Sequence, residues 1–142
     1  MPMPNNVPVI DLMMAVPNKD TSNFYDFIKQ LLMDEQSQQM FQRPEQYMFK
    51  DLPRVGKRDD YIAYTLEKMD EFNIEKAMIG VDEDQYDTQN EAVLKHPERF
   101  IACYDTNPNK GMEEVRKIRR LHEKYDLKAV TAFPSGLCPQ VS

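Results

Sequence analysis

Three short apolar segments recur along the second half of the chain at a nearly constant spacing. They cover residues 77–81, 100–104 and 128–133, and from Ala77 to Ile101 to Ala129 the repeat is about 24 to 28 residues. Between them lie stretches whose apolar residues recur at helical spacing. Such alternation, with short polar turns, is typical of right-handed crossovers in a parallel sheet. This pattern predicts an α/β protein.

A further apolar segment, residues 7–13, predicts the first strand of the same sheet. The stretch that follows it, residues 18–58, has a weaker pattern, and we interpret it as an insertion after the first strand of a single domain over residues 1–142. Four parallel strands fit either half of a (β/α)8 barrel or an open doubly wound sheet, and the pattern alone does not separate them. The 142 residues fall short of the ~250 that a complete barrel usually needs.

The helices expected between these strands have recognisable ends. Asp59 or Asp60 is a candidate N-cap for the first, and Asn73 is a plausible left-handed stop. Asp87 is the expected cap of the second helix, which must end before Pro97. The third helix is expected to bury its apolar positions, namely Met112, Val115, Ile118, Leu121 and Tyr125.

Charge and composition exclude several classes of partner. The net charge is −6 with a pI near 4.9, so no basic stripe is expected to bind nucleic acid. The basic cluster at residues 116–120 alternates with apolar residues and is expected to be a solvated helix face. No secretory segment and no apolar run near the ~18 residues of a membrane span is present, which predicts a cytoplasmic protein without membrane contact. Cys103, inside an apolar run, is expected to be a reduced packing residue.

Candidate site residues follow from the expected sheet. In both architectures ligands gather at the C-terminal ends of the strands. Asp105 and Asn107 follow the third strand and Ser135 follows the fourth, and we predict that these three contact a small-molecule substrate. Residues 82–84 (DED) follow the second strand and are expected to form a solvated loop and helix-cap cluster.

Asp11 is the most informative candidate, because a carboxylate inside an apolar run costs several kcal/mol unless it is paired, hydrogen-bonded or bound to a metal. Two interpretations stay open. In one, Asp11 accepts hydrogen bonds from backbone N–H groups at the end of the strand. In the other, it is a catalytic residue or metal ligand.

Three phrases give the chain a family resemblance. Residues 96–102 (HPERFIA), followed by Asp105 and Pro108, residues 69–79 (MDEFNIEKAMI) and residues 125–130 (YDLKAV) stand in the order and spacing of the amidohydrolase-related (amidohydrolase 2) family. That family includes metal-dependent decarboxylases of aminocarboxymuconate semialdehyde and of hydroxybenzoates. The resemblance covers roughly residues 7 to 135 and implies the N-terminal half of a TIM barrel, with an insertion after the first strand.

The resemblance also implies an activity. Relatives of this kind are hydrolases or carboxy-lyases that act on small carboxylated or carbonyl compounds, with a divalent metal, Zn or Mn, that polarises the substrate or activates a water. By the resemblance, Asp11 would be the contribution of the first strand to the metal site.

This chain departs from the family in its first strand. The family usually carries D-x-H-x-H there, whereas Met13 and Ala15 replace the histidines here. Because methionine is a poor ligand for Zn²⁺ or Mn²⁺, we expect no tight metal binding by this chain alone. The alternative function is therefore a catalytically inactive fragment or binding module that keeps the scaffold.

A half barrel also has open edges and an uncovered inner face, so we expect possible self-association through the sheet edges. The candidates for the inner face are Val9, Met13, Ile79, Ile101 and Val130.

Overall fold

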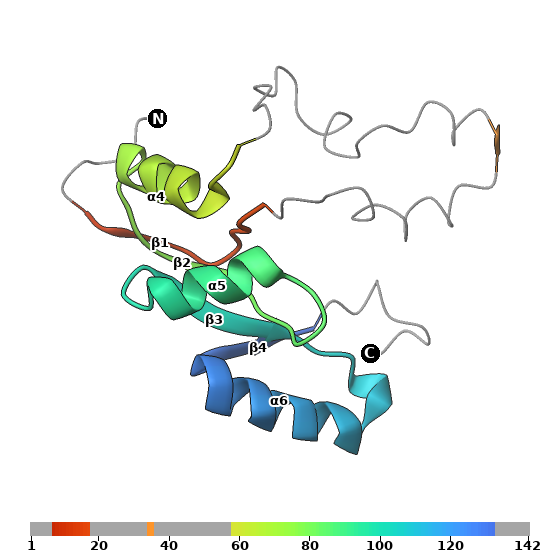
Figure 1. Cartoon of the computed structure of the whole chain (residues 1–142). Coiled ribbons are helices and arrows are strands. Elements are labelled where there is room, and N and C mark those ends of the chain that lie inside the picture. The colour runs from red at the N-terminus through yellow and green to blue at the C-terminus, as the bar shows by residue number, and fades with distance from the viewer. Residues whose placement is uncertain (1–6, 18–33, 36–57, 133–142) are drawn as a thin grey trace. The chain divides into compact units, whose positions relative to one another are not determined.

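The computed structural model of the chain describes residues 7–17, 34–35 and 58–132 (Figure 1). The chain divides into two compact units, Met1–Asn18 together with Asp60–Ser142, and Lys19–Asp59. Ser135 and nearly all of the expected insertion at 18–58 lie outside the described residues. The single-domain organisation and the insertion therefore stay predictions.

The sheet has four parallel strands in the order in which they occur along the chain. They are β1 (Val9–Asp11), β2 (Ile74–Gly80), β3 (Phe100–Asp105) and β4 (Ala129–Thr131), and the spatial order is β1-β2-β3-β4 (Figure 1). The register pairs Ala77 with Phe100 and Cys103 with Ala129. A doubly wound sheet would reverse its order at a switch point, so this curled half-barrel sheet fits the first of the two expected architectures.

Two strands differ in extent from the prediction. β1 is shorter than residues 7–13, because the Asp11 Oδ1 accepts the Met13 N–H at 2.8 Å and turns the chain after the strand. β2 begins three residues before Ala77, because Ile74 and Lys76 pair with Val9 and Ile10 of β1. Strand pairing thus extends β2 through a polar stretch that the apolar pattern excluded.

The first helix, α4 (Tyr61–Glu71), has the ends that the sequence predicted. Asp60 is its N-cap, and the Asp60 Oδ1 accepts the Ala63 N–H at 2.9 Å. Just beyond the helix, Asn73 has φ 56° and its side chain donates to the Val7 carbonyl at 3.0 Å. The amide of Asn73 therefore ties the end of the helix to the segment that leads into β1.

Asp60→Ala removes this cap, and we expect the free energy of unfolding to fall by about 1 kcal/mol. Asp59→Ala removes the same charge from an exposed neighbour that does not cap the helix, so its effect should stay within about 0.5 kcal/mol. Urea denaturation of both variants measures the difference. Equal losses in the two would contradict a capping role for Asp60.

The start of α5 (Asp87–Lys95) corrects the prediction that Asp87 is its cap. The N-cap position belongs to Tyr86, whose φ is 63°, and Asp87 is the first helical residue. Asp87 still favours the helix, because a carboxylate in the first turn complements the helix dipole. The helix ends before Pro97 as predicted.

Helix α6 (Met112–Tyr125) follows a short 3₁₀ turn, Pro108–Lys110. Leu121 and Tyr125 are buried as predicted and Ile118 is partly buried, but Met112 and Val115 are exposed while Glu114 is buried. The prediction for Met112 and Val115 was wrong because, at 3.6 residues per turn, they lie about 180° and about 120° around the helix from the buried Leu121. None of the described helices is long and apolar enough to cross a membrane.

The core lies between the helices and one face of the sheet. Side chains alternate between the two faces along each strand, and the helix-facing positions of β2 and β3 from Ala77 onward are buried, as is Cys103 on the other face. These positions are Ala77, Ile79, Val81, Phe100, Ala102 and Tyr104, packed with Met69 and Leu121 of the helices. Ile79 therefore faces the helices rather than the inner face for which it was a candidate. The other positions, Met78, Gly80, Ile101, Cys103 and Asp105, define the inner face.

Both outer edges of this sheet are unpaired within residues 7–17 and 58–132. Exposed apolar side chains lie beside each edge, at Ile10 and Leu12 on one side and at Val130 on the other. Because unpaired edges favour pairing with another chain, we expect the purified chain to sediment as a dimer or larger species at micromolar concentration. Val130→Lys places a charge at the β4 edge and should shift the distribution toward monomer, whereas a monomeric wild type would contradict the expectation.

Candidate functional site

The parallel sheet brings the C-terminal ends of its strands to one edge, as the sequence analysis required. Asp11 ends β1, Asp105 ends β3, and Asn107 follows in the loop after β3. Ser135 lies outside the described residues. The structure therefore places two of the four predicted residues, Asp11 and Asp105, at the ends of strands of one sheet.

Asp105 lies on the inner face beside β4. The Thr131 hydroxyl donates to the Asp105 Oδ1 at 3.3 Å, and the two residues are partners in the register of β3 and β4. The Asp105 carboxylate is exposed. An exposed carboxylate beside a hydroxyl can accept a hydrogen bond from a bound molecule, which is the role predicted for Asp105. The sequence analysis had no signal for Thr131.

Cys103 lies on the same inner face of the sheet, two residues before Asp105. It is a buried free thiol whose Sγ lies 3.8 Å from the Thr131 Oγ1. Burial raises the pKa of Cys103 and the charge of Asp105 adds to this, while the contact with Thr131 offsets only part. Because the thiolate is the nucleophilic form, the arrangement supports the expected packing role.

Tyr86 covers the inner face over Gly80. Gly80 occupies an inner-face position of β2, and a Cβ atom added there would lie 3.7 Å from the Tyr86 ring. Burial raises the pKa of Tyr86, and the charges of Asp105 and Asp82 raise it further, so the phenol stays a hydrogen-bond donor at neutral pH. A positive φ in a tyrosine has no sequence signature, and so Tyr86 was missed.

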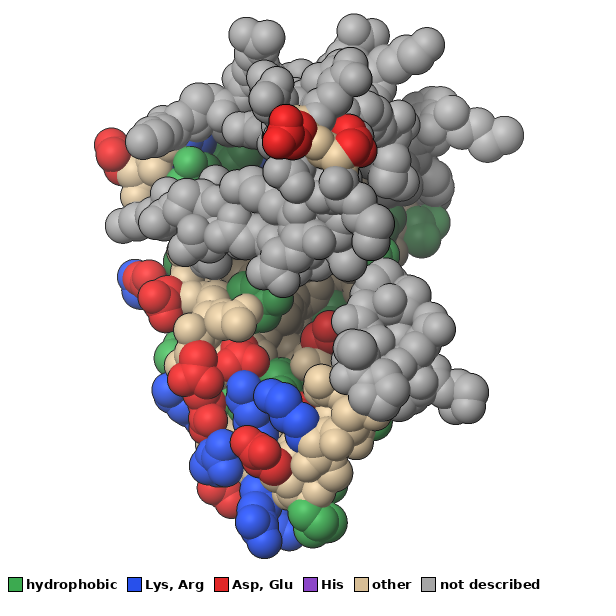
Figure 2. Space-filling model, turned by 90° about the vertical axis from the view of Figure 1, so that its right-hand side faces the viewer, with side chains coloured by type: hydrophobic (Ala, Val, Ile, Leu, Met, Phe, Trp, Pro, Cys, Tyr) green, Lys and Arg blue, Asp and Glu red, His purple; other side chains and the backbone are tan. Residues whose placement is uncertain are grey.

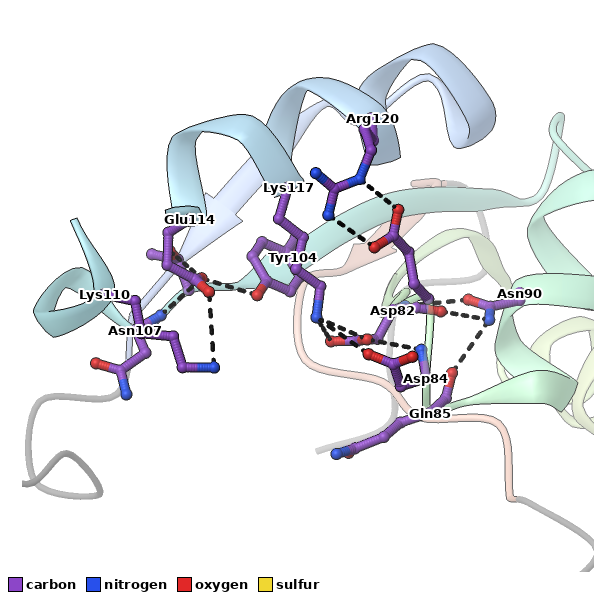
Figure 3. Close-up of polar contacts among 12 residues, drawn as sticks. Asp82, Asp84, Gln85, Asn90, Tyr104, Asn107, Lys110, Glu114, Lys117 and Arg120 are labelled. Carbon is purple, nitrogen blue, oxygen red and sulfur yellow. Dashed lines mark hydrogen bonds and ion pairs between the residues drawn. The ribbon is translucent and has the colours of Figure 1, made fainter. Parts of the chain in front are cut away.

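Behind the sheet, Glu114 of α6 binds the end of β3. Its Oε2 accepts hydrogen bonds from the Tyr104 hydroxyl at 2.8 Å, the Thr106 hydroxyl at 2.8 Å and the Asn107 backbone N–H at 3.1 Å (Figure 3). The residue is 3% exposed. Burial alone raises the pKa of Glu114, but these hydrogen bonds outweigh it and the net pKa is lowered. Burial and the hydrogen bond to Glu114 raise the pKa of Tyr104.

One helical turn further along, Lys117 binds the end of β2. Its Nζ lies 2.9 and 3.0 Å from the two oxygens of Asp82, whose backbone N–H and C=O both bond to the side chain of Asn90 on α5 (Figure 3). Burial lowers the pKa of Lys117, but the hydrogen bond to Asp82 and nearby negative charges outweigh it, so the net pKa is raised. The ammonium also lies 5.2 Å from the centroid of the Tyr104 ring.

Three residues after Lys117, the guanidinium of Arg120 donates to both carboxylate oxygens of Glu83, at 2.9 and 3.0 Å. Together, the side chains of Glu114, Lys117 and Arg120 bind the loops that follow β2 and β3. Figure 2 shows acidic and basic side chains intermixed over the part of the molecule where α6 lies. The spacing of three residues was a signal in the sequence, because such residues lie on one side of a helix.

These contacts correct two expectations. Residues 82–84 and 116–120 were expected to be solvated, but the side chains of Asp82 and Lys117 are only 14% and 16% exposed. Charged groups are buried to this degree when they are paired, and their partners lie 35 residues apart in the sequence. Asp84 and Arg120 remain exposed, as expected.

The Asp82–Lys117 pair should show a measurable coupling energy. In a double-mutant cycle with Asp82→Ala and Lys117→Ala, we expect about 1–2 kcal/mol, because each single change leaves a largely buried charge without its partner. The exposed pair of Lys95 and Glu91 on α5 provides the control, with an expected coupling of about 0.3–0.5 kcal/mol. Chemical denaturation of the wild type and the six variants of the two cycles measures both values. A coupling no larger than the control would contradict the buried pairing.

Asn107 and Asp11 both make local contacts. The Asn107 side chain accepts the Asn109 N–H at 3.1 Å and caps the 3₁₀ turn. Asp11 accepts the Met13 N–H, which is the first of its two interpretations, while its catalytic role stays a prediction. Asp11 and Asp105 thus make hydrogen bonds with different partners, Met13 and Thr131.

The residues at this edge do not fit a metal ion. Within the described ranges, no group of three or more His, Cys, Asp or Glu side chains is placed to hold one. Beside Asp11, Met13 is 96% exposed and Ala15 carries no donor atom.

The two longer phrases of the family resemblance meet in the structure. Arg99 of the first phrase donates to Asp70 of the second at 2.7 Å, and also to the carbonyls of Glu75 and Ile74 at 3.0 and 3.2 Å. These residues join the end of α4 and the start of β2 to the start of β3. Their role in this chain is to hold the N-terminal side of the sheet, opposite the candidate site.

The fold and this edge define an α/β protein with a parallel half-barrel sheet whose strand ends carry polar groups on the inner face. Comparison of the chain with protein-family models, with curated proteins and with solved structures gave no match.

Proposed function

We propose that this chain is the N-terminal half of an amidohydrolase-related barrel and contributes to the site of a hydrolase or carboxy-lyase for a small molecule. The observation that supports this most is the sheet itself. Its four strands pair in parallel and in sequence order, and β3 and β4 carry the Asp105–Thr131 contact at their C-terminal ends. Barrel enzymes bind their substrates at this edge.

The charges at the edge favour one of the two expected substrate classes. Asp105 and Asp11 are carboxylates, and the Tyr86 phenol and Thr131 hydroxyl are neutral. Lys117 is paired with Asp82 on the side of the helices, and Lys110, in the 3₁₀ turn after β3, lies 4.0 Å from Glu114 of α6. A carboxylate on the ligand would therefore meet repulsion, whereas a neutral carboxamide can accept from a hydroxyl through its carbonyl oxygen and donate its N–H to Asp105. We propose a small neutral carbonyl compound as the ligand.

Asp105 would bind and orient such a compound, with Thr131 holding the carboxylate in place. Saturation-transfer NMR with benzamide and benzoate as probes tests this role. We expect benzamide to bind more tightly than benzoate, and Asp105→Ala to weaken benzamide binding. Glu123→Ala, which removes an exposed carboxylate from α6, is the matched control and should bind like the wild type. Equal binding of benzamide by wild type and Asp105→Ala would contradict the role of Asp105.

A second candidate function is a binding module that keeps the scaffold without the metal. It is favoured by the Asp11–Met13 contact and by the missing histidines in the first strand. In this function the edge binds the same class of compound and catalyses no reaction alone.

Metal titration by calorimetry separates the two functions. We expect the wild type to bind Zn²⁺ or Mn²⁺ weakly or not at all. Restoring the family pattern with Met13→His and Ala15→His should tighten Zn²⁺ binding by about tenfold or more, and adding Asp11→Ala should reverse the gain. Stoichiometric metal binding by the wild type that is lost in Asp11→Ala would contradict the second candidate function, a binding module without the metal. A restored variant that gains no affinity would count against the family resemblance.

A further inference from the structure

We infer that Glu114 is a positioning residue for Asp105: by binding the residues on both sides of Asp105, it holds this carboxylate on the inner face of the sheet. The inference rests on the proposed function, in which Asp105 contacts the ligand. It assigns to a buried residue of α6 an effect on binding at the opposite face of the sheet.

The contacts of Glu114 surround Asp105 in the sequence. Tyr104 and Thr106, its two neighbours, donate their hydroxyls to the same Oε2 atom, and so does the N–H of Asn107. Side chains alternate along a strand, so fixing Tyr104 on the side of the helices directs Asp105 to the inner face. One oxygen thus restrains three of the four consecutive residues 104–107.

The other side of this segment is held by β4. The Thr106 N–H donates to the Thr131 carbonyl at 2.8 Å, and the Thr131 hydroxyl donates to Asp105. Asp105 is therefore fixed between a hydrogen-bonded strand and the carboxylate on α6. Loss of the Glu114 contacts removes the hydrogen bonds on the side of the helices and leaves those to β4.

The burial of Glu114 gives separate support. Glu114 is 3% exposed and lies on the same side of α6 as the buried Leu121, and a carboxylate in that position is costly unless it is hydrogen-bonded. All three of its hydrogen-bond donors belong to residues 104–107 at the end of β3. A change at Glu114 therefore acts first on the segment that carries Asp105.

The experiment compares benzamide binding and stability in the full chain. Glu114→Gln keeps the size of the side chain and one acceptor oxygen but removes the negative charge, so the hydrogen bonds from Tyr104, Thr106 and Asn107 to that oxygen become weaker. We expect benzamide to bind about threefold to tenfold more weakly, because hydrogen bonds to a neutral acceptor are only about half as strong. Val93→Ala, a change in the buried face of α5, serves as the control for lost stability and should leave the affinity unchanged.

A positioning role also predicts the result of combining the two substitutions. In the Asp105→Ala background, Glu114→Gln should cause no further loss of affinity, because it acts through Asp105. Additive losses would overturn the inference, as would wild-type affinity in Glu114→Gln or an equal loss in Val93→Ala.

Amide hydrogen exchange separates this inference from the proposed function. Glu114→Gln should accelerate exchange at Thr106 and Asn107 by about tenfold relative to Val93→Ala, whether or not benzamide binds. If the wild type binds no benzamide, the proposed ligand class is wrong, and the exchange rates still test the positioning. Unchanged rates at both amides would overturn it.

Discussion

Glu114→Ala is expected to lower the free energy of unfolding by about 3 kcal/mol, measured by urea denaturation at neutral pH. The change leaves the buried hydroxyl of Tyr104 without its acceptor and removes the partner of Thr106 and of the Asn107 N–H. Each unsatisfied buried donor costs about 1–3 kcal/mol, and the lower end applies to Thr106 and Asn107, which are half buried.

Glu113→Ala is the control, because Glu113 is the exposed neighbour in the same first turn of α6. It removes the same charge and the same favourable interaction with the helix dipole, so its loss should stay below about 1 kcal/mol. A Glu114→Ala variant no less stable than Glu113→Ala would show that the three donors find water in place of the carboxylate.

The effect of Glu114 should depend on pH in a defined direction. The net pKa of Glu114 is lowered in the folded protein, so the folded state holds this proton less tightly than the unfolded state. The stability is therefore fully present above the ordinary pKa near 4.5 and is lost as the pH falls through the lower folded value. The difference in stability between wild type and Glu114→Ala should shrink below about pH 4.5. A difference that stays constant would contradict the ionised state.

Leu121→Ala is expected to cost about 3–4 kcal/mol, within the range measured for buried leucines. Leu121 is 0% exposed and belongs to the core between α6 and the sheet, so the change removes apolar contacts and leaves a cavity. Val115→Ala, on the exposed side of the same helix, should cost less than about 1 kcal/mol. Thermal and urea unfolding of both variants test the rotation of α6. A larger effect of Val115→Ala would mean that the apolar stripe expected from the sequence is the buried one.

Several parts of the fold could be predicted because they depend on local pattern. The apolar segments of β3 and β4, the cap at Asp60 and the left-handed residue Asn73 are each decided by a few neighbouring residues. The parallel sheet also followed from the alternation of strands and helices, whereas the strand order β1-β2-β3-β4, which separates a half barrel from a doubly wound sheet, came from the structure.

The candidate site was predicted in part for the same reason. Parallel strands place the residues that follow them at one edge, so Asp11 and Asp105 could be chosen without coordinates. The role of Asn107 as a turn cap was not separable from a substrate contact, because an amide oxygen in a loop suits both.

Other features required the tertiary structure. The pairing of Lys117 with Asp82 joins residues 35 apart, and each looked solvated in its own segment. Tyr86 reaches Gly80 only because its backbone adopts a positive φ, which no pattern of residues indicates.

The sequence by itself determined the elements of this protein and their order, because hydrophobic periodicity and capping act over a few residues. Only the tertiary structure decided what the carboxylate of Glu114 binds. Glu114 is buried on the same side of α6 as Leu121, and its three donors belong to the end of β3. A buried carboxylate is costly unless it is hydrogen-bonded, and these donors come from a segment that no pattern within the helix identifies.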